Sequence, residues 1–274
     1  MNALAIGSEL CSRSFVQVTI LGSGSEGNAL LLESETTSVV VDAGISHRRL
    51  VARIRSLGRD LPTVSAVIVT HGHTDHAAHA SVYASRFGCP IYATKPTQRA
   101  LRVKSATEVR TLTVGRRLRL GDITVMSRSV PHDAPQVALR LESAATSVGL
   151  VTDLGHVPSD LARFLDSCDT LLLESNHDED MLDQGPYPLP LKRRVGGSHG
   201  HLSNAQAGDL LANLSTAPAR VVLMHLSETN NTERLARASA EAALGHCGTE
   251  LRVARPRDAM ALPFMGSRQL RLGL

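Results

Sequence analysis

Aromatic side chains are scarce in this sequence. Its 274 residues include three tyrosines, four phenylalanines and no tryptophan. Proteins that hold single-stranded nucleic acid without sequence preference stack the bases on aromatic side chains. The shortage therefore argues against a base-stacking platform, and if a nucleic acid binds, contacts to its phosphates are expected to dominate.

Paired cysteines, long apolar runs and a leader are missing as well. No apolar run approaches membrane-spanning length, and the first fourteen residues lack the apolar core of a signal peptide. We therefore expect a cytoplasmic protein with no membrane partner. The cysteines form no C-x-x-C motif, which is typical of free thiols in a reducing compartment. They are Cys11, Cys89, Cys168 and Cys247.

The order of strand and helix patterns predicts one domain. Apolar, β-branched runs alternate with helical patterns in both halves, and no linker separates the halves. This order favours an α/β fold with two mixed sheets face to face and helices outside. We expect a domain over residues 15–264, with tails at residues 1–14 and 265–274.

Positive charge is unevenly distributed, although the net charge is only +3. Residues 86–120 hold nine lysines or arginines and one acid, and residues 47–59 form a second basic stretch. Such stretches are either solvated helix faces or an electrostatic seat for a polyanion such as nucleic acid.

The densest group of chemically competent side chains follows the apolar run at residues 64–69, which predicts a buried strand. It reads H-x-H-x-D-H and contains His71, His73, Asp75 and His76. Imidazole nitrogens with a carboxylate suit a borderline divalent ion, with room for two ions if more ligands arrive. A polar loop that holds three histidines by chance is the alternative, and the density argues against it.

A glycine-rich loop at residues 22–27 reads G-x-G-x-x-G, and Asp42 lies twenty residues beyond its first glycine. In a dinucleotide-binding fingerprint the third glycine opens a helix. Here two strand patterns follow at once, which leaves no room for a crossover helix. We therefore reject this function and expect a tight loop near the metal site.

Three later strand tips each offer one more ligand: His132, Asp153 and His225. With the first cluster, this order resembles that of the metallo-β-lactamase superfamily, over nearly the whole chain. The resemblance implies a four-layer αββα sandwich with a two-metal cleft at the sheet edges.

Eight further motifs resemble the YycJ/VicX subfamily of that superfamily. The resemblance implies a bacterial double-stranded DNA exonuclease linked to mismatch repair, with ribonucleases J and Z as distant relatives. One departure is Gly72, where the family usually has Glu; it removes a carboxylate but no ligand. The motifs are GSGSEGN (22–28), VDAG (41–44), HDA (132–134), TDLG (152–155), ESNHD (174–178), GPYP (185–188), GHLSN (200–204) and HLSETNN (225–231).

The resemblance also implies roles for the ligands, with two divalent ions as cofactors. One ion would be held by His71, His73 and His132, and the other by Asp75, His76 and His225, with Asp153 between them. His132 could instead lie behind the ligands. Zn²⁺ or Mn²⁺ is expected, and Fe²⁺ also suits this ligand set.

The predicted reaction is metal-assisted phosphodiester hydrolysis. Asp75 would also orient the attacking water, and His201 would protonate the leaving 3′-oxygen, with His177 as the second candidate. Loop packing is the alternative for both histidines, and His79, Asp133 and His199 are expected at the surface or behind the ligands. The candidate substrate-binding residues are Ser23, Asn28, Asn176, Lys192, Arg193 and Arg194.

The sequence therefore predicts a double-stranded DNA 5′-to-3′ exonuclease acting in mismatch repair, with duplex DNA as its partner. One alternative is another hydrolase on the same scaffold, such as a thioesterase, a lactonase or a small phosphodiesterase. The other is a nucleic-acid-binding module with a vestigial metal site.

Overall fold

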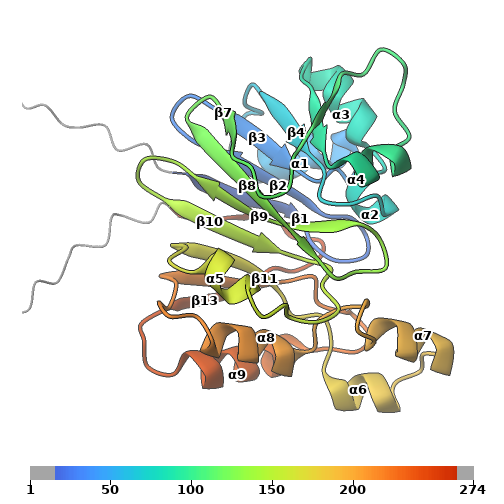
Figure 1. Cartoon of the computed structure of the whole chain (residues 1–274), viewed down its shortest axis with the longest axis vertical. Coiled ribbons are helices and arrows are strands. Elements are labelled where there is room, and N and C mark those ends of the chain that lie inside the picture. Colours follow the sequence, from blue (N-terminus) through green and yellow to red (C-terminus); the bar gives the residue numbers. More distant parts are fainter. Residues whose placement is uncertain (1–15, 264–274) are drawn as a thin grey trace, which may run out of the picture.

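The computed structural model describes residues 16–263, so the predicted tails at residues 1–14 and 265–274 lie outside the described residues. Within this range two seven-stranded sheets pack face to face, and helices cover their outer faces (Figure 1). The predicted α/β, four-layer αββα sandwich is confirmed. No helix of residues 16–263 is long and apolar enough to cross a membrane.

The first sheet has the strand order β14-β1-β2-β3-β4-β5-β6. Its strands pair antiparallel from β14 to β3 and parallel from β3 to β6. The strands are β1 (Gln17–Gly22), β2 (Ala29–Glu33), β3 (Ser38–Val41), β4 (Ala66–Ile68), β5 (Ile91–Ala93), β6 (Val109–Thr111) and β14 (Met260–Ala261).

The second sheet repeats this plan in the order β13-β12-β11-β10-β9-β8-β7. Pairing is antiparallel from β7 to β10 and parallel from β10 to β13. The strands are β7 (Leu118–Leu120), β8 (Ile123–Val130), β9 (Gln136–Glu142), β10 (Ser147–Val151), β11 (Thr170–Glu174), β12 (Arg220–Met224) and β13 (Glu250–Val253).

Most helices begin where the sequence predicts them. Ser46 caps the first helix, and Ser203 forms a capping box with Gln206. The helices are α1 (His47–Ser56), α2 (Thr74–Ala77), α3 (Ala80–Phe87), α4 (Lys95–Ala100), α5 (Leu161–Leu165), α6 (Glu179–Gln184), α7 (Leu189–Val195), α8 (Asn204–Ala212) and α9 (Glu233–Leu244).

Two helical segments differ from the prediction. The helix expected over residues 75–87 is split into α2 and α3, and residues 185–200, expected to be a loop rich in Pro and Gly, contain α7. Proline is compatible with the first turn of a helix because the N–H it lacks has no helical partner there. Pro188 and Pro190 therefore flank the start of α7 without breaking it.

Successive side chains of each strand pack on opposite faces of the sheet, and this produces the apolar layers of the core. On β11, Leu172 belongs to the apolar cluster between the sheets, whereas Leu171 and Leu173 pack with residues of α8 and α9. On β2, Leu30 faces the other sheet and Leu31 packs toward α1 and α3. Successive strand residues point to opposite faces, so each strand buries both sides.

The carboxyl ends of the parallel strands position the functional side chains. Asp42, Asp153 and His225 follow β3, β10 and β12, and each has a left-handed backbone, with φ of 62°, 56° and 57°. This conformation costs an L-residue about 1–2 kcal/mol, and it turns the chain sharply at the strand tip. Helices α2, α4 and α7 gather at the same end of the sandwich, on the right in Figure 1.

Candidate metal centre

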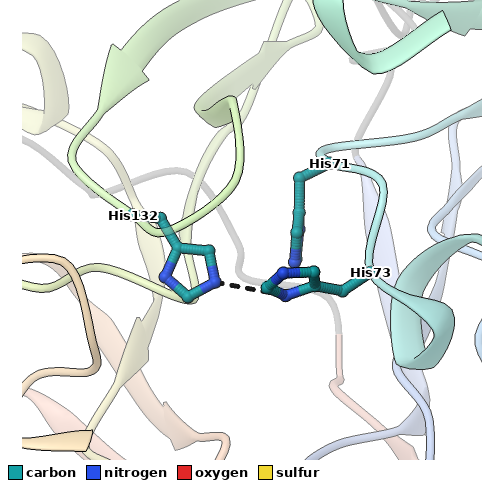
Figure 2. Close-up of side chains that lie close together, drawn as sticks. All are labelled: His71, His73 and His132. Atoms are coloured by element: carbon teal, nitrogen blue, oxygen red, sulfur yellow. Dashed lines mark hydrogen bonds between the residues drawn. The ribbon is translucent and has the colours of Figure 1, made fainter. Parts of the chain in front are cut away.

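The first cluster of ligand-type side chains consists of His71, His73 and His132, called here the histidine group (Figure 2). Their ring centroids lie 4.6–5.2 Å apart, and His132 Nε2 is 3.3 Å from His73 Nδ1. His71 and His73 follow β4 of one sheet, whereas His132 follows β8 of the other. His132, the least certain ligand in the sequence, therefore lies beside the other two.

Hydrogen bonds fix which ring nitrogens of the histidine group point inward. His132 Nδ1 lies 3.0 Å from the carbonyl oxygen of Gly200, which can only accept, so Nδ1 carries the hydrogen. His73 Nε2 lies 3.1 Å from Asp133 Oδ1. This carboxylate oxygen also accepts, so Nε2 carries the hydrogen of His73. His132 Nε2 and His73 Nδ1 therefore face each other, and His132 Nε2 also lies 3.2 Å from Asp133 Oδ1.

The second cluster consists of Asp75, His76, Asp153 and His225, called here the carboxylate group. His76 Nε2 lies 3.0 Å from Asp153 Oδ2 and 3.5 Å from Asp75 Oδ2, and His225 Nε2 lies 3.7 Å from Asp75 Oδ2. The two groups adjoin, since the rings of His71 and His76 are 4.2 Å apart. All seven side chains predicted as ligands thus meet at one rim.

Two buried carboxylates hold the imidazoles of the carboxylate group from behind. Asp42 Oδ2 lies 2.6 Å from His76 Nδ1, and Glu174 Oε1 lies 2.9 Å from His225 Nδ1. The other oxygen of Glu174 accepts from the backbone N–H groups of Leu154 and Leu202. Both histidines therefore carry hydrogen on Nδ1 and direct Nε2 toward the rim.

The two groups differ in protonation. Burial lowers the pKa of His71 well below its usual value and also lowers the pKa of His132, although the charge of Asp153 opposes both shifts. Burial opposes protonation of His225 too, but Asp153, Asp75 and Glu174 outweigh it and raise the pKa of His225 to about 10. Near neutral pH His71 and His132 are thus uncharged, whereas the carboxylate group concentrates charge.

Unpartnered buried atoms show that these side chains fit divalent cations. Within the described part of the chain, His71 Nε2 and His225 Nε2 are buried without a hydrogen-bond partner, and Asp153 Oδ2 makes no well-aligned hydrogen bond although it lies 3.0 Å from His76 Nε2. Each such atom costs about 1–3 kcal/mol when nothing satisfies it. Imidazole nitrogens and carboxylate oxygens are also the donors that Zn²⁺, Mn²⁺ and Fe²⁺ take in proteins.

His201 and His177, the two candidate proton donors, lie in different places. His201 Nδ1 is 2.8 Å from Glu174 Oε1 and 3.6 Å from Asp153 Oδ1, and its side chain is 23% exposed at the rim. His177 is buried and lines a separate pocket beneath α6 and α7 with Glu179. The structure therefore brings His201 to the ligands and does not bring His177 there.

Ser23 and Asn28, expected to bind substrate, are buried and point into the protein. Ser23 Oγ accepts from the backbone N–H of His225 at 2.9 Å. The amide of Asn28 lies 2.8 Å from His76 Nε2, and its oxygen accepts from Gly24 N. Both residues hold ligands in position. Neither side chain reaches the open rim here, and contact of Ser23 and Asn28 with substrate stays a prediction.

The remaining expected substrate residues divide between two pockets. Asn176 and Arg194 line the pocket that contains His201 and His225. Arg194 makes two contacts with Asp133, at 2.7 and 2.8 Å. Lys192 and Arg193 instead line the pocket that contains His177. Of these three neighbouring basic residues, Arg194 alone therefore faces the rim.

Three carboxylates support the site, and the sequence indicated a supporting role for none of them but Asp133. Asp42 and Glu174 each end an apolar strand, so an acid after a buried run was the available signal. Asp133 was expected at the surface or behind the ligands, and it contacts both His73 and His132. Spacing alone does not show that these acids converge on the ligands.

Three comparisons bear on this arrangement. A family model described as beta-lactamase superfamily domain matches residues 37–226. Exodeoxyribonuclease WalJ of Streptococcus pneumoniae is 32% identical over 227 residues, covering 80% of this chain and 84% of its own. Exodeoxyribonuclease YycJ of Bacillus anthracis is 32% identical over 236 residues, covering 84% and 89%. The crystal structure of the metallo-beta-lactamase fold protein YhfI from Bacillus subtilis superposes with a TM-score of 0.71 at 20% identity, covering 90% and 99%.

Proposed function

The chain belongs to the metallo-β-lactamase superfamily and is a metal-dependent hydrolase, and we propose that it is an exonuclease that degrades double-stranded DNA. The observation that carries this proposal is the meeting of the histidine group, the carboxylate group and His201 at one rim. The relatives named exodeoxyribonuclease, 32% identical over most of the chain, support the choice of substrate.

Two divalent ions are the proposed cofactors, Zn²⁺ or Mn²⁺, with Fe²⁺ also compatible with the donors. His71, His73 and His132 would hold one ion, and Asp75, His76 and His225 the other. Asp153 would serve both, as the resemblance of the motifs implies; it belongs to the carboxylate group, which adjoins the histidine group. Such ions supply a nucleophile at neutral pH and offset negative charge on the phosphoryl oxygens.

Two side chains of the protein would orient the attacking water and protonate the leaving oxygen. The carboxylate of Asp75 is 22% exposed at the rim and would orient the attacking water by accepting a hydrogen bond. The water would lose a proton to solvent and add to phosphorus, the bond to the leaving 3′-oxygen would break, and His201 would give that oxygen its proton. Glu174 holds His201 for this task by accepting from Nδ1, which leaves Nε2 free to donate.

Exposed cations beside the rim support a polyanionic substrate. Lys95 and Arg99 are exposed on α4, and Ala100 at the end of this helix lies against Gly72 between the first two histidines. Arg194 lies at the other side of the rim, on α7. The duplex would therefore approach across α4, and its end would reach the metal ligands near α7.

Polarity and cellular role are proposed on the resemblance of the motifs. We assign 5′-to-3′ digestion, action in mismatch repair and a cytoplasmic location. Asn176 remains a proposed substrate contact, because it lines the pocket at the rim.

The decisive experiment incubates the full chain, loaded with Mn²⁺ or Zn²⁺, with linear duplex DNA that is blocked at the 5′ ends, the 3′ ends or neither. We expect nucleotides to be released from duplexes with free 5′ ends, whereas a 5′ block should prevent release. The variant His201→Gln is the control for the proton donor and should be about 10²–10⁴-fold slower. Turnover of a thioester or lactone without any nucleotide release would refute the proposal.

A further inference from the structure

A pocket of about 260 Å³ opens beside His201 and His225. Tyr187, Leu191 and Val195, from α7 and the segment before it, give it apolar lining, and Leu226 from the loop after β12 adds to this lining. Pockets for drug-sized ligands begin near 300 Å³. The space therefore suits one small unit with a flat apolar part and does not suit a run of stacked bases.

The polar part of the pocket suits the hydroxyl groups of a sugar. Ser25, Ser227 and Thr229 bring hydroxyl groups to it. Ser227 Oγ accepts from the backbone N–H groups of Thr229 and Asn230, so its own hydrogen is free to be donated. Two acids also line the pocket: Asp133 is paired with Arg194, and Glu228 lies 3.8 Å from Arg257. Arg257 lies closer to Glu26, at 2.9 Å, so only the charge of Asp133 is directly paired.

The position of His201 connects this pocket with one part of the substrate. In the proposed reaction the terminal nucleotide departs with its 3′-oxygen, and His201 gives that oxygen a proton. Because His201 lines the pocket, the group that departs has to lie in or next to it. The rest of the duplex then extends away from α7.

We propose that this pocket receives the nucleoside of the departing terminal nucleotide, with its base packed against Tyr187 and Leu191. The proposal rests on the proposed function, and it adds that the enzyme recognises the base at the strand end by contact and without regard to its identity. Every base has an aromatic face, so such packing tolerates any sequence. Tyr187 is then a specificity-determining residue that distinguishes a complete nucleotide from one that lacks a base.

Helix α7 supplies a matched control. Leu191 lines the proposed nucleoside pocket, whereas Leu189, two residues earlier and 57% exposed, lines the pocket that contains His177. Leu191→Ala and Leu189→Ala remove the same atoms from the same helix. Only the first change should affect recognition of the base.

The experiment compares two linear duplexes that differ only at the 5′-terminal position, which carries either a normal nucleotide or an abasic sugar phosphate. The metal-loaded full chain should release the normal nucleotide about tenfold faster, as measured by kcat/KM. Tyr187→Ala and Leu191→Ala should bring this ratio close to one. Tyr187→Phe should keep the ratio because the aromatic face remains. Leu189→Ala should also keep it, because Leu189 does not line the nucleoside pocket.

The metal content of each purified variant, measured by elemental analysis, checks that the metal centre is intact. A lost ratio with unchanged metal content supports the proposal. Equal release of normal and abasic ends by the unmodified chain would overturn it, as would a ratio that survives in both Tyr187→Ala and Leu191→Ala. Failure of the proposed function has another signature, since the unmodified chain would then release no nucleotide from either duplex.

Discussion

The histidine group and the carboxylate group adjoin but are built differently. The first offers three imidazoles, supported by the Gly200 carbonyl and the partly exposed Asp133. The second adds two carboxylates and is supported by Asp42 and Glu174, both fully enclosed. Charge and burial therefore favour tighter binding of a cation by the carboxylate group, and the histidine group should exchange its cation more readily.

The largest effect on the two groups is expected from a change at Asp153, because its charge acts on both of them. Asp153→Asn keeps the shape but removes the charge, so we expect cleavage of duplex DNA to fall by roughly 10²–10³-fold. Metal analysis should show less bound metal in both groups. His132→Ala is the control and should lower the metal content of the histidine group alone. Near-normal cleavage by Asp153→Asn would contradict the proposed ligand set.

Supporting carboxylates allow the two groups to be perturbed separately. Asp42→Asn should weaken cation binding by the carboxylate group, and Asp133→Asn should weaken it at the histidine group, each by about 10–100-fold. Calorimetric titration of metal-free protein with Mn²⁺ or Zn²⁺ would resolve the two binding steps. If both variants change the same step, the division into two groups is wrong.

Removing the metal should lower thermal stability. A ligand that binds only the folded state at 100 times its Kd stabilises it by about 2.7 kcal/mol, which for a chain of this size is about 5–10 °C in Tm. We expect a chelator to lower the Tm of the unmodified chain by this amount or more, as measured by scanning calorimetry. His132→Ala should keep the part of the shift that comes from the carboxylate group. A Tm that does not respond to the chelator would argue against bound cations.

The smallest expected effect concerns Gly72, the position that departs from the family pattern. A Cβ at Gly72 would lie 2.6 Å from the Cβ of Ala100 on α4, so Gly72→Ala should destabilise the fold by about 1–3 kcal/mol through overpacking. Ala100→Gly in the same chain should restore most of this loss. Denaturant unfolding of both variants measures the effect, and a stable Gly72→Ala single variant would show that α4 moves aside easily.

Local sequence signals predicted most of the site and the layers. His71, His73, Asp75 and His76 are close in sequence, and strand-tip ligands such as His225 follow apolar runs that are plainly strands. Apolar runs such as Leu171, Leu172 and Leu173 predicted strands, and the structure places Leu172 between the sheets and its two neighbours against the helices. Signals that depend on a few adjacent residues are readable without a structure.

Features that depend on direction or on distant contacts could not be predicted. Ser23 and Asn28 are polar residues in a glycine-rich loop, and nothing in the sequence shows that they turn inward toward His225 and His76. His177 and His201 both follow strand or helix boundaries, yet only His201 contacts Glu174. Their positions depend on how α6 and α7 pack, which the proline-rich composition of that segment concealed.

The left-handed backbone at Asp42, Asp153 and His225 narrows the amino acids that evolution or an engineer can place there. Aspartate and asparagine tolerate this conformation better than β-branched residues do, so Val, Ile or Thr at these positions would disturb the chain before any chemistry is considered. Glycine would relax the backbone but would remove the functional side chain. Substitutions that relieve this strain to raise thermal stability would therefore remove the candidate metal ligands. Gains in stability have to come from other parts of the molecule.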